Sequence, residues 1–273
     1  MVYMYIQLAV HIKPYEQPIK HFSLGGKDNM GRISMIMFDL SGTTVFDDTG
    51  VRDCLYAAAQ EYGLDATPDQ ILMAMGTNKI HLYQFLIARS QGKDIDMKDF
   101  ERIDQLAPET YEEAKKVFDR YEELMEEHYR KNVAEVEGAS DTFRWCHENG
   151  IKVATGTGFH HGITQAIMDG LGWLKDGLVD ISVDVESIPG QRGRPAPFMI
   201  YHAMTQLNIQ SIHEVLKIGD TPADMLEGYN AGCRGVIGVL SGPRPVESWG
   251  KYWHTHIIPS VADLPELIEK EFS

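Results

Sequence analysis

The chain has 273 residues, 43% apolar and 24% charged, which suits a core domain with a smaller second domain. Its formal net charge of −15 argues against non-specific nucleic-acid binding, because that binding needs Lys and Arg to displace counterions. Three widely spaced cysteines argue against a disulfide framework or a zinc site, and no apolar run reaches the roughly 20 residues of a membrane helix. We therefore expect a cytoplasmic protein that binds neither nucleic acid nor membrane.

The first 32 residues contain no clear strand or helix pattern. They begin with MVYMYIQLAV, which is apolar but lacks the basic start and the small-residue cleavage site of a signal peptide. We treat residues 1–32 as an N-terminal extension whose role the sequence does not define.

Five short apolar runs predict strands that are buried on both faces of a parallel sheet. They are residues 33–39 (ISMIMFD), 151–155 (IKVAT), 178–183 (LVDISV), 215–220 (VLKIGD) and 235–240 (GVIGVL). Helical patterns alternate with the later runs, at residues 139–148, 162–171, 197–207 and 223–231. This alternation predicts right-handed crossovers and a doubly wound, Rossmann-like α/β fold.

A long segment without any strand-like run, residues 51–135, follows the first predicted strand. Its patterns predict helices at residues 52–62, 68–75, 80–89 and 111–131. We predict that this segment is an all-helical cap over the carboxyl ends of the strands, where open α/β sheets bind ligands. The core domain then consists of residues 33–50 and 136–273.

Two motifs that follow the first two strands carry groups suited to a phosphoryl group. In DLSGTT, residues 39–44, Asp39 ends the strand and a glycine permits a tight turn, although this pattern is as typical of an Asx-type turn. In TGTG, residues 155–158, the Thr155 hydroxyl and the backbone N–H of Gly156 are donors of the kind that a phosphate oxygen needs. A glycine loop alone would look the same.

Two later motifs add positive charge and further acids. Arg194, in GRP just before a predicted helix, offers a permanent charge and a forked set of donors, although a surface arginine is the commoner explanation. Asp220 ends another apolar strand and begins the motif DTPAD, which also contains Asp224. Together with Asp39, Asp220 offers two carboxylates to one Mg²⁺ ion, which prefers oxygen ligands. Asp224 would orient the water molecules on that ion.

The order and spacing of these motifs closely resemble the haloacid dehalogenase superfamily. Its pattern is D-x-x-G-T-T, then a hydroxyl followed by glycine, then a basic residue, then G-D-x-x-x-D, and the match runs from residue 33 to about residue 268. The helical insertion also lies where that superfamily has its type-1 cap. The resemblance implies a hydrolase that cleaves a small phosphorylated or phosphonate substrate through an aspartyl-phosphate on Asp39.

The same resemblance implies the rest of the site. Its cofactor is Mg²⁺, and the metal ligands that it implies are Asp39, Ser41, Asp220 and Asp224, with Ser41 contributing its carbonyl. Arg194 and Thr155, next to Gly156, would hold the equatorial phosphate oxygens.

Three departures from the usual phosphatase pattern resemble the phosphonatase-like branch, which includes the phosphonoacetaldehyde hydrolases. Ser41 stands where most family phosphatases have a second aspartate, Arg194 replaces a lysine, and the cap carries Met75-Gly76-Thr77-Asn78-Lys79. In that branch the cap lysine forms an imine with the substrate aldehyde, and by resemblance this lysine is Lys79. A solvated lysine at a helix start is the alternative. Leu82 occupies a position where the phosphonoacetaldehyde hydrolases have histidine.

Several questions stay open at this level. The hydrolase would cleave either a C–P bond through a Lys79 imine or an O–P bond, with Asp47, Asp48 or water as the acid that Ser41 cannot be. A phosphotransferase or mutase, and a non-catalytic binding module of the same fold, are further alternatives, and a homodimer is left open. His254 and His256 are interpreted as the entry to a final strand instead of a metal site, because no third ligand lies nearby.

Overall fold

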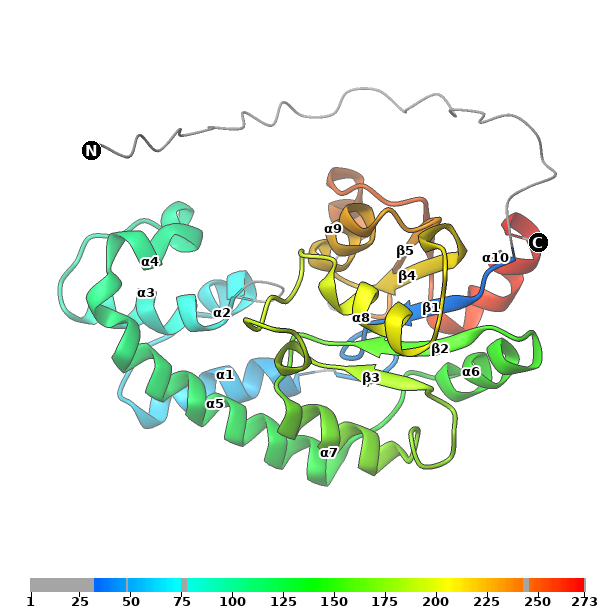
Figure 1. Ribbon diagram of the computed structural model, residues 1–273. Helices are drawn as coiled ribbons and strands as arrows, with labels where there is room; N and C mark the ends of the chain where they lie inside the picture. Colours follow the sequence, from blue (N-terminus) through cyan, green and yellow to red (C-terminus); the bar gives the residue numbers. More distant parts are fainter. Residues whose placement is uncertain (1–31, 48, 75–77, 243–245, 273) are drawn as a thin grey trace, which may run out of the picture. The chain divides into compact units, whose positions relative to one another are not determined.

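The computed structural model describes residues 32–47, 49–74, 78–242 and 246–272 (Figure 1). The N-terminal extension predicted at residues 1–32 lies outside this range except for Arg32, and so do Asp48 and residues 75–77. No helix in the described part of the chain is both long enough and apolar enough to cross a lipid bilayer.

A six-stranded parallel sheet forms the centre of the core. Its order is β3-β2-β1-β4-β5-β6, which is the order of a doubly wound α/β fold. The strands are β1 (Met35–Phe38), β2 (Lys152–Gly156), β3 (Ile181–Val183), β4 (Val215–Gly219), β5 (Gly235–Val239) and β6 (His256–Ile258). The predicted fold class is therefore confirmed, and His256 is the first residue of the final strand.

One strand is shorter than predicted. The run at residues 178–183 was expected to be extended throughout, but β3 begins only at Ile181. The N–H groups of Leu178 and Val179 both donate to the Trp173 carbonyl, so they close a turn and cannot join the sheet. The first hydrogen bond to the neighbouring strand comes from Asp180, whose N–H donates to the Val153 carbonyl at 2.8 Å.

Successive strand residues point to opposite sides of the sheet, so each face carries its own apolar cluster. Helices cover both faces. In β1, Ile36 and Phe38 belong to one apolar cluster, while Met35 and Met37 belong to another. The helices of the core are α6 (Ala139–Glu148), α7 (His161–Leu171), α8 (Phe198–Gln206), α9 (Pro222–Ala231) and α10 (Leu264–Glu271). Helices α6, α7 and α10 share the cluster of Phe38, and α8 and α9 share that of Met37.

The segment between β1 and α6 contains helices and short 3-10 turns, and we refer to residues 50–132 as the cap. Its helices are α1 (Gly50–Glu61), α2 (Pro68–Ala74), α3 (Ile80–Ser90), α4 (Ile103–Leu106) and α5 (Tyr111–Asn132), with 3-10 turns at Met97–Arg102 and Pro108–Thr110. The four predicted cap helices begin and end within two residues of their predicted bounds. Only α4 was not predicted, since four residues are too few for a periodic pattern.

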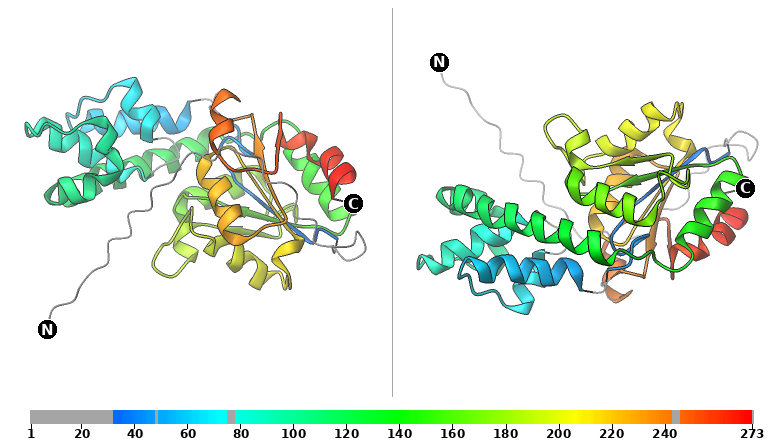
Figure 2. Two further views of the ribbon diagram at one scale, coloured as in Figure 1. Left: turned by 90° about the horizontal axis from the view of Figure 1, so that it is seen from above. Right: turned by 90° about the horizontal axis from the view of Figure 1, so that it is seen from below.

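Helix α5 joins the cap to the core. It packs against α1 and α3 within the cap and against α7 of the core, as the two views of Figure 2 also indicate. Its buried residues recur every three or four positions, which places them on one side of the helix: Ala114, Val117, Tyr121, Met125 and Tyr129. The cap lies at the end of the sheet toward which the strands point (Figure 1).

Candidate active site

Asp39 directly follows β1, and a tight turn holds it at the carboxyl end of the strand. The backbone N–H groups of residues 43–45 all donate to the Leu40 carbonyl. Gly42 has a φ of +83°, and a Cβ there would lie 2.6 Å from Oδ2 of Asp220. Glycine is therefore required at this position for two reasons, the backbone angle and the nearness of a second acid.

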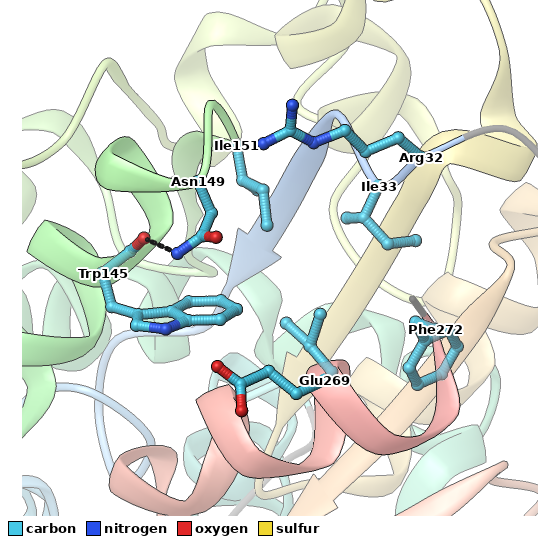
Figure 3. A pocket seen from close by; sticks show the side chains of 8 residues that line it. Arg32, Ile33, Trp145, Asn149, Ile151, Glu269 and Phe272 are labelled. Carbon is cyan, nitrogen blue, oxygen red and sulfur yellow. Dashed lines mark hydrogen bonds between the residues drawn. The ribbon is translucent and has the colours of Figure 1, made fainter.

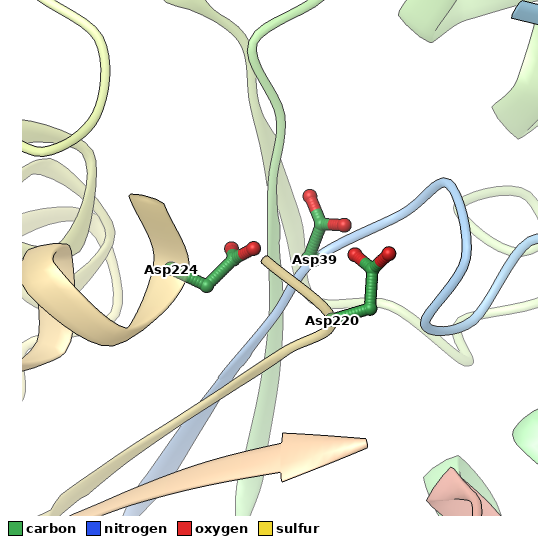
Figure 4. Close-up of side chains that lie close together, drawn as sticks. All are labelled: Asp39, Asp220 and Asp224. Carbon is green, nitrogen blue, oxygen red and sulfur yellow. The ribbon is translucent and has the colours of Figure 1, made fainter. Parts of the chain in front are cut away.

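Asp220 and Asp224 meet Asp39 at this edge of the sheet, and Figure 4 shows the three carboxyl groups close together. One carboxylate oxygen from each lies within 4.8 Å of the others. All three are buried, with exposed fractions of 4% for Asp39, 3% for Asp220 and 0% for Asp224. Asp224 can pack against the end of β4 because a Cβ on Gly219 would collide with its carboxyl group.

The three acids differ in how well they are compensated. Burial raises the pKa of Asp39 and raises that of Asp220 well above its usual value, and the charges of Asp39 and Asp224 raise the pKa of Asp220 further. Burial also acts to raise the pKa of Asp224, but Arg194 and Lys217 bring it down to about 2. Asp39 and Asp220 thus form a buried acidic pair that a hard divalent cation would stabilise.

Arg194 connects two of these acids. Its Nη2 lies 2.7 Å from Oδ1 of Asp39, its Nη1 is bonded to Oδ1 of Asp224, and Nη2 also donates to the Gly156 carbonyl at 3.4 Å. The side chain is only 11% exposed. The guanidinium is therefore fixed beside the carboxylate of Asp39, where it can contact the oxygens of any group that Asp39 attacks.

Lys217 is a buried partner of the site that the sequence analysis did not single out. Its Nζ lies 2.8 Å from Oδ1 of Asp224 and 3.3 Å from Oε2 of Glu227, and none of the three side chains is exposed. A continuous chain of alternating charges thus runs from Asp39 through Arg194, Asp224 and Lys217 to Glu227. The available signal was a lysine within an otherwise apolar strand, VLKIGD.

The structure separates the two threonines of the TGTG motif. Thr155 lies within β2, and its Oγ1 donates to Oγ of Ser182 on the neighbouring strand at 2.8 Å. Thr157 follows the end of β2 and Gly156, so it belongs to the loop at the edge where the acids lie. Its Oγ1 accepts a hydrogen bond from the Phe159 N–H at 3.1 Å and can still donate its proton. Thr157 is a second residue that the sequence analysis missed.

Ser41 lies in the turn after Asp39 and is paired with a nearby acid. Its Oγ donates to Oδ2 of Asp47 at 2.9 Å, and Oδ1 of Asp47 accepts the N–H of Val51 at 3.4 Å. The first turn of α1 therefore holds Asp47 beside the position where the common family pattern has its second aspartate.

Lys79, at the start of α3, extends the site into the cap. Burial lowers the pKa of its ammonium to about 8, and the charge of Arg194 also lowers it, while Asp39, Asp47 and Asp220 act in the opposite direction. Arg194 and these three acids all belong to the site described above, so Lys79 interacts electrostatically with that site. The other residues of the cap motif, residues 75–77, lie outside the described part of the chain.

A cavity and the pair His254 and His256 do not belong to this site. A cavity of about 320 Å³ opens at the amino ends of β1 and β2, opposite the acids (Figure 3), and its lining residues are Arg32, Ile33, Trp145, Asn149, Ile151, Ile268, Glu269 and Phe272. Among the described residues, the single cluster of potential metal ligands is the one formed by the three aspartates, and neither His254 nor His256 belongs to it.

Comparison with known proteins identifies the family. The model of the haloacid dehalogenase-like hydrolases matches residues 33–232. The chain belongs to this family. The hydrolase fold and the sequence resemblance to this superfamily are thereby confirmed.

The alignments with related proteins cover most of this hydrolase. It is 26% identical over 275 residues to phosphonoacetaldehyde hydrolase of Parabacteroides distasonis, a match that covers 88% of this chain and 97% of the relative. It is 25% identical to the enzyme of that name from Bacillus cytotoxicus, over 88% of each chain. The structure of a phosphonoacetaldehyde hydrolase-like protein from Oleispira antarctica has a TM-score of 0.63 at 20% identity, and covers 88% of this chain and 92% of its own. A hydrolase from Pseudomonas syringae has a TM-score of 0.68 at 17% identity, over 88% and 100% of the two chains.

Replacing Lys217 by Met in this hydrolase is expected to destabilise the fold by about 3–5 kcal/mol, because it leaves the buried Glu227 without a cationic partner and leaves Asp224 with Arg194 alone. Urea unfolding measures this change as a shift of the midpoint. The matched control is Lys115→Met, which breaks an exposed ion pair with Asp119 and should cost less than about 1 kcal/mol. Equal midpoints for the two variants would mean that the buried pairing contributes nothing to stability.

Proposed function

We propose that the protein is a Mg²⁺-dependent phosphohydrolase that transfers a phosphoryl group from a small metabolite to Asp39 and then to water. The observation that carries this proposal is the meeting of Asp39, Arg194 and Asp220 at the carboxyl edge of the sheet. A nucleophilic carboxylate, a fixed guanidinium and a buried acidic pair are the groups that phosphoryl transfer through an acyl phosphate requires.

The donor set fits a magnesium ion. Its oxygens are hard ligands, and two of the three acids lack full compensation by protein cations. Asp39, Asp220 and the Ser41 carbonyl would hold the ion. Both oxygens of Asp224 already accept hydrogen bonds, from Arg194 and from Thr221, so its role is to orient the water molecules on the metal. When bound, Mg²⁺ supplies positive charge that offsets the repulsion between a carboxylate and a phosphoryl group.

Each protein group then has a separate role in the reaction. One oxygen of Asp39 attacks phosphorus in line with the leaving group, and the P–O bond to the leaving group breaks. Arg194 holds an equatorial oxygen of the phosphoryl group, and Thr157 donates its hydroxyl proton to another. We assign that contact to Thr157 and not to Thr155, because the Thr155 hydroxyl is used within the sheet. Water finally attacks the acyl phosphate and releases phosphate from Asp39.

The leaving oxygen needs a proton, and Asp47 is our candidate for its source. Ser41 cannot act as an acid near neutral pH, but its hydroxyl is bonded to the Asp47 carboxyl group. The other oxygen of Asp47 accepts the N–H of Val51 in α1, so Asp47 contacts both the turn after Asp39 and the first helix of the cap. Asp48, the other acid considered from sequence, lies outside the described residues.

A second candidate function is C–P cleavage, and the lowered pKa of Lys79 favours it. With a pKa of about 8, a substantial share of this amine is neutral at physiological pH, as attack on an aldehyde requires. The amine would condense with the aldehyde and lose water, Asp39 would take the phosphoryl group, and the C–P electron pair would move into the imine. Proton uptake and hydrolysis would then release the aldehyde product and regenerate Lys79.

A substrate panel tests the proposal and separates the two bonds. Small phosphate monoesters and phosphonoacetaldehyde are supplied with Mg²⁺, and phosphate release is measured for the wild type and for Lys79→Arg. In O–P cleavage Lys79 needs only its charge, so Lys79→Arg should keep activity within about tenfold of wild type. Release of phosphate from no member of the panel would contradict the proposed function.

The second candidate makes a distinct prediction for Lys79. Borohydride added with phosphonoacetaldehyde would trap the substrate on Lys79, and the rate of inactivation would rise with pH through about pH 8, where half of the amine is neutral, and level off above it. Lys79→Arg would be inert. We expect O–P cleavage, in which Lys79→Arg stays active and no adduct forms. The reason is that Leu82, which is fully buried, replaces the histidine that the aldehyde-cleaving relatives carry. An adduct at Lys79 detected by mass spectrometry would favour C–P cleavage instead.

A further inference from the structure

Arg194 is held differently from the other groups of the site. Asp39, Thr157 and Asp220 each directly follow a strand, so the sheet fixes their backbones. Arg194 instead lies in the long connection between β3 and α8, which is not part of the sheet (Figure 1). Its backbone must therefore be fixed by contacts within that connection.

The tip of the Arg194 side chain has to change partners during the reaction that we propose. In the resting site its Nη2 lies 2.7 Å from Oδ1 of Asp39, the group that attacks phosphorus. Once the phosphoryl group arrives, the same guanidinium has to bind its oxygens. Contacts at the tip alone cannot hold the arginine in place through this exchange, and a fork of donors is effective only while its orientation is kept.

The segment before Arg194 contains two successive residues with left-handed backbones. Gly190 has a φ of +76°, which glycine adopts freely, but Gln191 also has a φ of +50°. Among the described residues, the other non-glycine residue with a positive φ is Asn208, and asparagine commonly adopts that conformation. A glutamine there is strained, and such strain persists only where neighbouring contacts fix the backbone.

Arg192, between Gln191 and Arg194, supplies two such contacts. Its guanidinium carbon lies 3.9 Å from the centroid of the Phe198 ring, and its Nε donates to the Pro189 carbonyl at 3.2 Å. Pro189 precedes the strained residues and Phe198 is the first residue of α8. One side chain therefore connects the two ends of the segment that carries Arg194.

The backbone on the other side of Arg194 has its own anchor, because Nδ2 of Asn230 in α9 donates to the Pro195 carbonyl at 2.9 Å. Arg192 is the anchor on the strained side. It is exposed and belongs to neither apolar cluster of the core. Its loss should let the turn relax and displace Arg194, while the packing of the sheet and its helices persists.

We propose that Arg192 is a positioning residue for phosphoryl transfer. Stacked on Phe198, it holds the strained turn in the conformation that directs the Arg194 guanidinium to the phosphoryl group. The inference rests on the proposed function and adds a residue that acts on the reaction through Arg194, without contacting the reacting atoms itself.

Steady-state kinetics of Arg192→Ala test this role, with the member of the substrate panel that wild type cleaves fastest. Arg194 interacts with charge that develops in the transition state, so kcat should fall by about tenfold while KM changes by less than about threefold. The melting temperature should stay close to that of wild type, because the side chain is exposed. Arg192→Lys keeps a cation over the ring and a donor for the Pro189 carbonyl, so it should recover most of the lost kcat.

Arg234→Ala is the matched control. Arg234 also lies over a phenylalanine ring, with its guanidinium carbon 5.6 Å from the ring centroid of Phe272, and its Nη2 donates to the Phe272 carbonyl at 3.4 Å. It directly precedes β5, at the amino end of the sheet and thus opposite the acids. Its kcat should remain that of wild type.

A double-mutant cycle shows whether Arg192 acts through Arg194. Arg194→Lys keeps the charge beside Asp39 and Asp224, so this variant should fold, but a flexible ammonium has no fork to orient. In this background Arg192→Ala should lower kcat by less than about threefold, against about tenfold in the wild-type background.

Three results would overturn the inference. Arg192→Ala could keep the kcat of wild type, or it could lose as much in the Arg194→Lys background as alone, which would mean that it does not act through Arg194. A lower melting temperature and a lost activity that Arg192→Lys does not restore would assign Arg192 to stability alone. By contrast, a wild type that cleaves no member of the panel would contradict the proposed function itself, and this inference with it.

Discussion

Asp39→Asn is expected to abolish phosphate release, with a loss in kcat of about 10⁴-fold or more. Asparagine keeps the size of the side chain and an oxygen that can accept the hydrogen bond from Arg194, so the surroundings of the site should persist. It removes the anionic oxygen that attacks phosphorus, and among the described residues Asp39 is the one carboxylate that directly follows β1.

The matched control for this variant is Asp184→Asn. Asp184 is buried to a similar degree, at 3% exposed against 4% for Asp39, and it also directly follows a strand. Its carboxylate caps a short turn at Ser187 and contacts His161, away from the acidic cluster. The control should therefore retain its turnover. Activity of Asp39→Asn within tenfold of wild type would remove Asp39 from the nucleophilic role.

Removal of divalent metal is expected to abolish activity, and Mg²⁺ should restore it. Without the ion, the raised pKa values of Asp39 and Asp220 mean that both carboxylates gain protons more readily, and a protonated Asp39 is no nucleophile. Asp220→Asn removes one of the ligands that we propose and should raise the Mg²⁺ concentration for half-maximal activity by about tenfold or more.

Metal binding also has a readout that does not depend on catalysis. A cation that binds only the folded protein raises its melting temperature, and the rise should be much smaller in Asp220→Asn than in wild type. Asp184→Asn again serves as the control and should respond to Mg²⁺ as wild type does. Full activity in excess chelator, with no thermal response to Mg²⁺, would exclude a metal role for the three aspartates.

Most of the fold could be predicted because its signals are local. Four of the five apolar runs that became strands are buried on both faces, and β3 at the edge of the predicted set is partly buried. Asp39 and Asp220 mark the points where two of these runs end. Acids at the carboxyl ends of neighbouring parallel strands must lie close together, so the acidic pair was accessible from sequence. That Arg194 belongs to the same site followed from the family resemblance, and the structure adds its hydrogen bond to Asp39.

The parts that sequence did not reveal depend on register and on contacts between distant elements. Thr155 and Thr157 are chemically identical, and only the end of β2 at Gly156 shows which hydroxyl lies beyond the sheet. Lys217 appears as one polar residue in an apolar strand until its partners on α9 are known. The interior position of Tyr121 likewise depends on how α5 packs against α1 and α3.

The most direct measurement of the central claim is to trap the phosphorylated enzyme. The protein is mixed with Mg²⁺ and a phosphate monoester that it cleaves, quenched in acid during turnover, digested, and examined by mass spectrometry. We predict that the peptide containing Asp39 gains the mass of one phosphoryl group, that hydroxylamine removes it, and that Asp39→Asn never acquires it. Rapid phosphate release with no modified peptide, or with the phosphoryl group on another residue, would contradict the account.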